Sequence, residues 1–129
     1  MGKAKKLDEY LNIKSEIIKP ALQQLRLELL QMGYSVELVE GGIERDLLLN
    51  EKGELEKIHS KRTHLLGQIS LKIKNDLNHV QVVVIGYVGG NVEIVNPQSE
   101  EVSLTDLNDI DTFLIKRQVR EKLNISKRE

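Results

Sequence analysis

A group of carboxylates followed by a lysine, in the middle of the chain, comes nearest to the pattern of a catalytic site. Asp46 precedes the run Glu54-Leu55-Glu56-Lys57, and a hairpin between the two segments would bring them together. Carboxylates of this kind can hold Mg2+ and activate a water molecule beside a phosphate. The chemistry that this group could support is therefore metal-dependent cleavage of a phosphodiester.

This arrangement faintly resembles the restriction-endonuclease-like nucleases, which use an acid on one strand and a Glu-x-Lys on the next. The sequence departs from that pattern, because Glu54 and Lys57 are three residues apart and Glu56 is adjacent to Lys57. Alternation along a strand would place ligand and lysine on opposite faces. We therefore assign no catalytic residue, and keep a divergent metal-dependent nuclease centred on Asp46, Glu54 and Lys57 as the enzymatic alternative.

A short basic strip follows the same segment. Lys57, His59 and Lys61 alternate, which on a strand gives one basic face, and Arg62 lies next to it. These four residues are a candidate anion-binding site, and they would serve a nucleic-acid-binding accessory protein. Acidic residues at 51, 54 and 56 stand directly before the strip, and the segment has no aromatic side chain on which a base could stack. A charged strand edge that discourages aggregation explains the same residues.

The remaining motifs predict no metal, cofactor or covalent nucleophile. His59 and His64 are five residues apart and converge neither on a strand nor on a helix. The glycines between Gly86 and Gly90 follow a strand without the G-x-G-x-x-G spacing, and a further strand comes after them. There is no cysteine, and no serine lies in a G-x-S-x-G elbow.

Composition describes one ordinary globular domain spanning residues 1–129. Of its 129 residues 40% are hydrophobic, and 19 Lys and Arg balance 20 Asp and Glu. That balance argues against a dedicated nucleic-acid-binding or membrane-surface protein. The longest apolar run, 82–85, is far shorter than the roughly 20 residues of a membrane-spanning helix. No signal peptide follows the basic start, so we expect a cytoplasmic protein.

The elements that would position these residues begin with a long helix. Apolar residues recur at helical spacing from Leu7 to Met32, and Gly33 is a good helix stop. Pro20 lies inside the pattern and predicts a kink or two abutting helices. Alternation predicts strands over 35–38, 65–74, 80–88 and 92–95, with turns at 41–42, 75–78 and 89–91. The segment 43–60 is interpreted as two more strands, and the alternative is a helix in this segment, which Leu47-Leu48-Leu49 would suit.

A second helix closes the chain, with an apolar stripe from Ile110 to Leu123 and a cap at Asn108 or Thr105. The acidic residues at 100, 101, 106, 109 and 111 are interpreted as preceding or opening this helix, where negative charge is favourable. The fold class is thus α+β: a long N-terminal helix, an antiparallel meander of about four to six strands, and a C-terminal helix.

Strand 80–88 differs from strand 65–74 because it is apolar on both faces. In 68–74 the polar residues share one face, which predicts a solvated side. In 80–88, Val82 and Val84 point one way while Val83, Ile85 and Tyr87 point the other. If both helices lie on one face, the side with Val83, Ile85 and Tyr87 is left as an apolar patch, which soluble monomers seldom leave open. The alternative is that the C-terminal helix itself covers that side.

From this pattern we expect a non-enzymatic binding or adaptor domain. It would act through protein–protein association, with a second copy or another protein, on an apolar sheet face at Val83, Ile85 and Tyr87. No cofactor and no membrane contact are expected.

Overall fold

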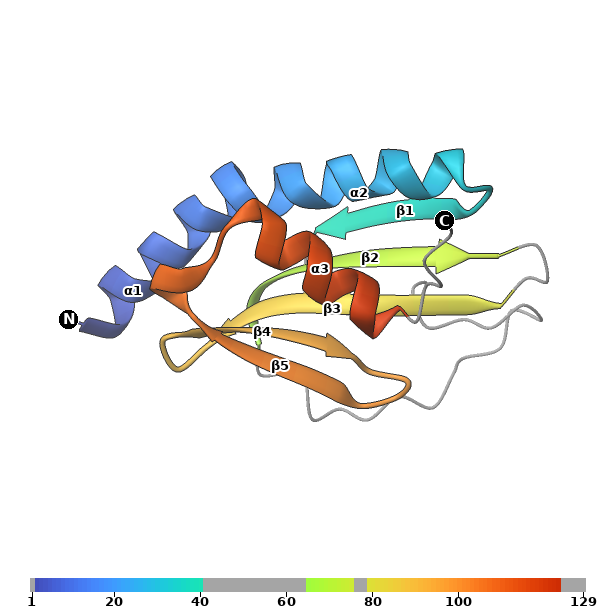
Figure 1. Cartoon of the computed structure of the whole chain (residues 1–129). Helices are drawn as coiled ribbons and strands as arrows, with labels where there is room; N and C mark the ends of the chain where they lie inside the picture. Colours follow the sequence, from blue (N-terminus) through green and yellow to red (C-terminus); the bar gives the residue numbers. More distant parts are fainter. Residues whose placement is uncertain (1, 41–64, 76–78, 124–129) are drawn as a thin grey trace.

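The computed structural model describes residues 2–40, 65–75 and 79–123. The chain starts with helix α1 (Gly2–Ile13), a π-helical turn η1 (Lys14–Ile18) and helix α2 (Lys19–Gln31). The strands are β1 (Ser35–Glu40), β2 (Leu66–Lys74), β3 (Val80–Val88), β4 (Asn91–Asn96) and β5 (Glu101–Asp106). A 3-10 turn, η4 (Leu107–Asp109), leads into helix α3 (Thr112–Lys122) (Figure 1). The predicted α+β fold class is confirmed.

The strands form a single antiparallel sheet in the order β1-β2-β3-β4-β5, so that each strand pairs with its neighbours along the described chain. Helices α2 and α3 both lie on one side of this sheet, and α3 crosses in front of it below α2 (Figure 1). The sheet therefore has a helix-covered face and a second face on the other side.

Pro20 explains why the long helix is not uniform. Proline lacks a backbone N–H and its ring crowds the carbonyl four residues earlier, so a regular α-helix cannot pass through it unchanged. The chain widens to π-helical pairing over Lys14–Ile18, and Pro20 then occupies the first turn of α2, where a donor is not needed. The sequence predicts a kink or two abutting helices at Pro20, whereas the structure has a π-helical turn there with helical backbone angles at Ile13, Ile18 and Lys19, so the helix continues.

Gly33 ends α2 as predicted. It has a φ of 99°, and the next residue, Tyr34, donates its N–H to the carbonyl of Leu29 at 3.1 Å. This left-handed ending is the geometry for which glycine is preferred. It turns the chain directly into β1.

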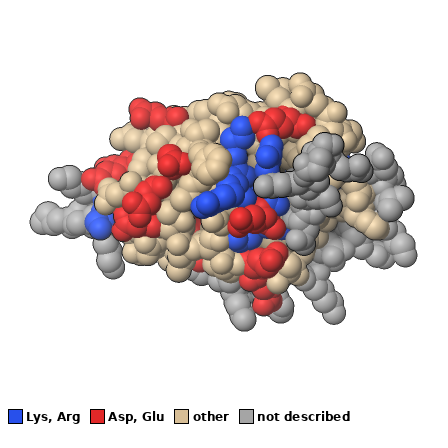
Figure 2. Space-filling model, in the orientation of Figure 1, with Lys and Arg blue, Asp and Glu red and all other residues tan. Residues whose placement is uncertain are grey.

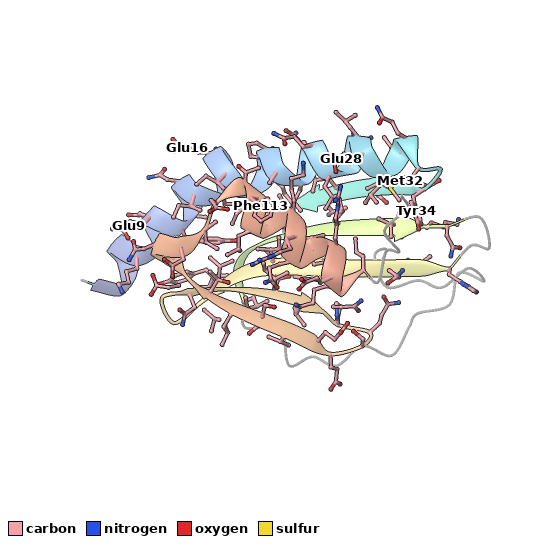
Figure 3. The ribbon with its side chains drawn as sticks, in the orientation of Figure 1. Glu9, Glu16, Glu28, Met32, Tyr34 and Phe113 are labelled. Carbon is pink, nitrogen blue, oxygen red and sulfur yellow. The ribbon has the colours of Figure 1, made fainter. Side chains whose placement is uncertain are left out.

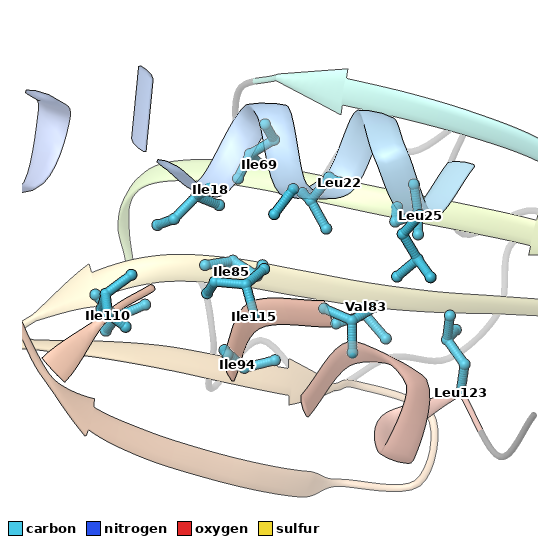
Figure 4. Close-up of a cluster of buried hydrophobic side chains, with 14 of the residues drawn as sticks. Ile18, Leu22, Leu25, Ile69, Val83, Ile85, Ile94, Ile110, Ile115 and Leu123 are labelled. Carbon is cyan, nitrogen blue, oxygen red and sulfur yellow. The ribbon is translucent and has the colours of Figure 1, made fainter. Parts of the chain in front are cut away.

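The main core lies between the helices and the covered face of the sheet (Figure 4). Leu22 and Leu25 on α2 and Ile115 on α3 are fully buried there, together with Ile85 and Ile94 from the sheet. Burying each such side chain contributes about 1.5–3 kcal/mol, which is the main reason the helices dock on this face.

Three predictions about local structure are wrong. The segment 101–106 is strand β5 rather than the approach to a helix. Helix α3 is capped by Asp111, whose carboxylate accepts from Leu114 N at 2.8 Å, and not by Asn108 or Thr105. The β2 face expected to be solvated is buried at Gln68 and Ser70 and becomes exposed only at Lys74.

The predicted strands or helix within 43–60 and the turn at 41–42 lie outside the described residues. Among the helices that the structure describes, none has the length and apolar character needed to cross a membrane.

Candidate interaction surface

The predicted apolar patch of Val83, Ile85 and Tyr87 is part of the core. All three side chains lie in the cluster that packs against the helices, and none is more than 6% exposed. Their face is the one that α2 and α3 cover, so the alternative raised by the sequence is the one observed. As an exposed interface these three residues are a wrong prediction, because the chain's own helices already cover them.

The second face of the sheet is the one that carries the other apolar residues of β3. Pairing aligns Val39, Ser70, Val84, Val95 and Val102 in one row across the five strands. The middle of this row is fully buried, at Ser70, Val84 and Val95. Exposure returns at the β5 end, where Val102 is 39% exposed.

The neighbouring row on the same face ends in a still more exposed residue. Gly86 pairs with Glu93, and Glu93 pairs with Leu104. Leu65 fills the space over Gly86, where an added Cβ would lie 2.7 Å from the Leu65 Cβ. Leu104, at the far end, is 60% exposed. The open apolar part of the second face is thus the pair Val102 and Leu104 on β5.

Helix α3 holds β5 from the covered side. Ser103 lies between Val102 and Leu104 and points to the opposite face. Its hydroxyl donates to Gln118 Oε1 at 2.6 Å and accepts from Lys122 Nζ at 2.5 Å. Lys122 is buried, and its backbone oxygen accepts from Asn96 Nδ2 at 2.8 Å. These bonds fix β5 and β4 to α3 and leave the Val102 and Leu104 side uncovered by any described helix.

Acidic side chains flank this apolar pair. Glu101 begins β5 and Asp106 ends it, and both are exposed. Figure 2 shows acidic groups near both ends of the strand, while Lys and Arg side chains gather over α3. Neither Glu101 nor Asp106 forms a salt bridge within the described part of the chain. We define the β5 surface as Glu101, Val102, Leu104 and Asp106, of which Glu101 lies on the face of Ser103 and the other three lie on the opposite face.

Three charged residues on the facing sides of α2 and α3 are paired with one another. Glu28 of α2 points towards α3 (Figure 3) and forms ion pairs with Lys116 and Arg120. Phe113, at the start of α3, is 73% exposed, and the guanidinium of Arg117 lies 5.8 Å from its ring centre. Pairs this exposed contribute little stability, about 0–1 kcal/mol each, and here they connect two helices.

The other site residues predicted from the sequence lie outside the described residues. Asp46 and Glu54, the acidic residues of the nuclease alternative, lie outside the described residues. So do all four residues of the predicted anion site, Lys57, His59, Lys61 and Arg62. Within 2–40, 65–75 and 79–123, no cluster of three or more His, Asp or Glu side chains could hold a metal ion.

The sequence contains a pattern typical of a strand at β5, although the acidic residues around it also suit the start of a helix. Val102-Ser103-Leu104-Thr105 alternates apolar and polar residues, and Asn96-Pro97-Gln98-Ser99 before it is rich in turn-forming residues. The acidic residues on both sides suit a helix N-terminus equally well, and that interpretation was the wrong one. The alternation in 102–105 would have predicted both the strand and its apolar side.

Comparison with known proteins gives no match to a family model, a curated protein or a solved structure.

Proposed function

We propose that this protein is a binding or adaptor domain that associates with another protein through the β5 surface. The observation that carries the proposal is the exposure of Leu104 and Val102 beside each other at the β5 end of a sheet face that is buried at Ser70, Val84 and Val95. A partner that covers such apolar side chains removes them from water, which is favourable. Fully burying an exposed leucine contributes about 1.5–3 kcal/mol of binding free energy.

The geometry of β5 supports the same role. Ser103 and Lys122 fasten the strand to α3 from behind, so the exposed side is presented on a rigid element. Binding to a surface that is already ordered costs less conformational entropy than binding to a flexible segment. Leu104→Asp would place a charge in the contact between β5 and its partner and oppose their association.

Affinity capture from cells of the source organism tests the proposal, using the intact chain, Leu104→Asp and the matched control Leu27→Asp. Leu27 is on α2 and is 58% exposed, close to the exposure of Leu104. We expect a protein that the intact chain and Leu27→Asp retain and that Leu104→Asp loses. Equal capture by all three chains, each with an unchanged melting temperature, would contradict the proposal.

A further inference from the structure

The two edge strands of the described sheet differ in what lies along them. At β1, Arg26 Nε of α2 donates to the carbonyl oxygen of Val36 at 3.3 Å, and Lys14 and Lys19 both pair with Glu40. The hydrogen bond from Lys19 holds the pKa of Glu40 below its ordinary value. Side chains of the helical segment thus occupy the β1 edge.

Strand β5 has β4 as its one strand neighbour in the described part of the chain. On its outer side, alternate N–H and C=O groups have no strand partner among the described residues, which is the arrangement that accepts an added strand. The strand, Glu101 to Asp106, contains neither proline nor lysine, the residues that commonly prevent an edge strand from pairing with another chain. The β5 edge is therefore the place where this sheet can be extended.

The charges at its ends determine what kind of strand fits. Suppose that β5 pairs antiparallel with β5 of a second copy about a two-fold axis. Residues opposite each other must then point to the same face of the sheet, so the axis passes through a residue, such as Ser103 or Leu104, and not between two residues. Either choice places Glu101 of one copy within one residue of the position opposite Asp106 of the other. Adjacent positions point to opposite faces of the sheet, so these two side chains would not oppose each other directly, but both ends of the joined strands would be acidic and β5 carries no basic residue to pair with either. A second copy is the poorer partner.

We propose that the partner is an extended segment of another protein that adds to the β5 edge, with basic residues at both ends of its paired stretch. Two apolar side chains spaced two residues apart would cover Val102 and Leu104. Lysine or arginine on either side of them would meet Glu101 and Asp106. This proposal rests on the association through the β5 surface and specifies the chemistry of the partner.

Synthetic peptides provide the test. The first alternates valine and threonine between terminal lysine pairs, the second has glutamate in place of each lysine, and the third is the lysine peptide with alternate backbone nitrogens methylated. Titration into the isotope-labelled intact chain, followed by NMR, reports both affinity and location. We expect shifts confined to β5 and β4, and binding at least about tenfold weaker for the glutamate and methylated peptides.

A variant with altered charge at both ends of β5 tests the role of the acidic residues directly. Glu101→Lys combined with Asp106→Asn removes the acidic ends, and the asparagine can still accept the hydrogen bond that Asp106 Oδ1 takes from Asn108 N. The matched control is Glu9→Lys with Asp8→Asn, the same change of charge at exposed positions of α1. We expect the swap to reverse the preference between the lysine and glutamate peptides, and the control to leave it unchanged.

Each other outcome overturns this inference in an identifiable way. Equal binding of the methylated peptide would mean attraction without strand addition, and equal binding of the glutamate peptide would remove the role of the acidic ends. A dimer seen by sedimentation that Leu104→Asp dissociates would identify the partner as a second copy. A captured protein that depends on Leu104 but not on Glu101 and Asp106 would leave the association in place and refute only the basic partner strand.

Discussion

The hydroxyl of Tyr10 offers a direct test of how the N-terminal helix is fastened to the sheet. It donates to the carbonyl oxygen of Gly67 at 2.7 Å, and Tyr10 is fully buried. Tyr10→Phe removes one oxygen and leaves that carbonyl without this donor. Leaving a buried acceptor without its partner costs about 1–3 kcal/mol.

Tyr87→Phe is the matched control. Its ring lies 5.4 Å from the Tyr10 ring and is buried in the same cluster. Its hydroxyl is neither among the buried unpaired oxygens nor in a hydrogen bond with the described part of the chain. We expect Tyr10→Phe to lose about 2 kcal/mol, or roughly 6–10 °C in melting temperature at this chain length, and Tyr87→Phe to lose less than about 0.5 kcal/mol.

The dependence on pH gives a second, independent readout. Burial raises the pKa of the Tyr10 phenol above its ordinary value of 10.0. The unfolded chain therefore loses this proton near pH 10 while the folded chain keeps it, so the unfolded state binds fewer protons and stability falls as pH rises above 10. At pH 11 the loss amounts to about 1.4 kcal/mol, and phenylalanine does not undergo it.

Urea unfolding of the intact chain and both variants at pH 8 and pH 11 measures both effects. We expect the deficit of Tyr10→Phe to shrink from about 2 kcal/mol at pH 8 to about 0.6 kcal/mol at pH 11. If Tyr10→Phe were as stable as Tyr87→Phe at pH 8, the hydrogen bond to Gly67 would not fasten α1 to β2. An equal deficit at both pH values would mean that the Tyr10 phenol is not buried as described.

The remaining predictions concern single sites. Gly67→Ala should destabilise the protein by more than about 1 kcal/mol, since Gly67 has a φ of 57° and an added Cβ would lie 2.7 Å from Tyr10 Cε2; thermal unfolding measures it. Ser70→Ala should be neutral or stabilising by about 1 kcal/mol, because the buried Ser70 hydroxyl has no hydrogen-bond partner in the described part of the chain; a measured loss above 1 kcal/mol would contradict this. Ser103→Ala should cost about 1–3 kcal/mol because Lys122 loses an acceptor while buried, whereas Lys122→Met with Ser103→Ala should recover most of that loss; a double-mutant cycle in urea tests the pair. Ile85→Asp should abolish cooperative unfolding by placing a carboxylate in the core, and a folded variant with near-native circular dichroism would mean that this side chain is not buried as described.

Elements with local signals can be predicted from the amino-acid sequence alone. The helical spacing from Leu7 to Met32 and the stop at Gly33 appear where short-range sterics and hydrogen bonding require them, and the helix becomes irregular just before Pro20. The two-sided apolar pattern of 80–88 was also correct, because Val83 and Val84 are both buried on opposite faces. Alternation fixes which residues share a face of the sheet.

The face of the sheet that the helices cover depends on packing between distant segments and could not be predicted from local pattern. Helices α2 and α3 pack on the side of Val83 and Ile85, and the sequence pattern of β3 suits either side equally. The same limit applies to β5, where local charge favoured the start of a helix and pairing with β4 makes it a strand instead. Burial depends on contacts between segments far apart in the chain, so the exposure of Leu104 and the burial of Ser70 follow from packing and not from the residues themselves.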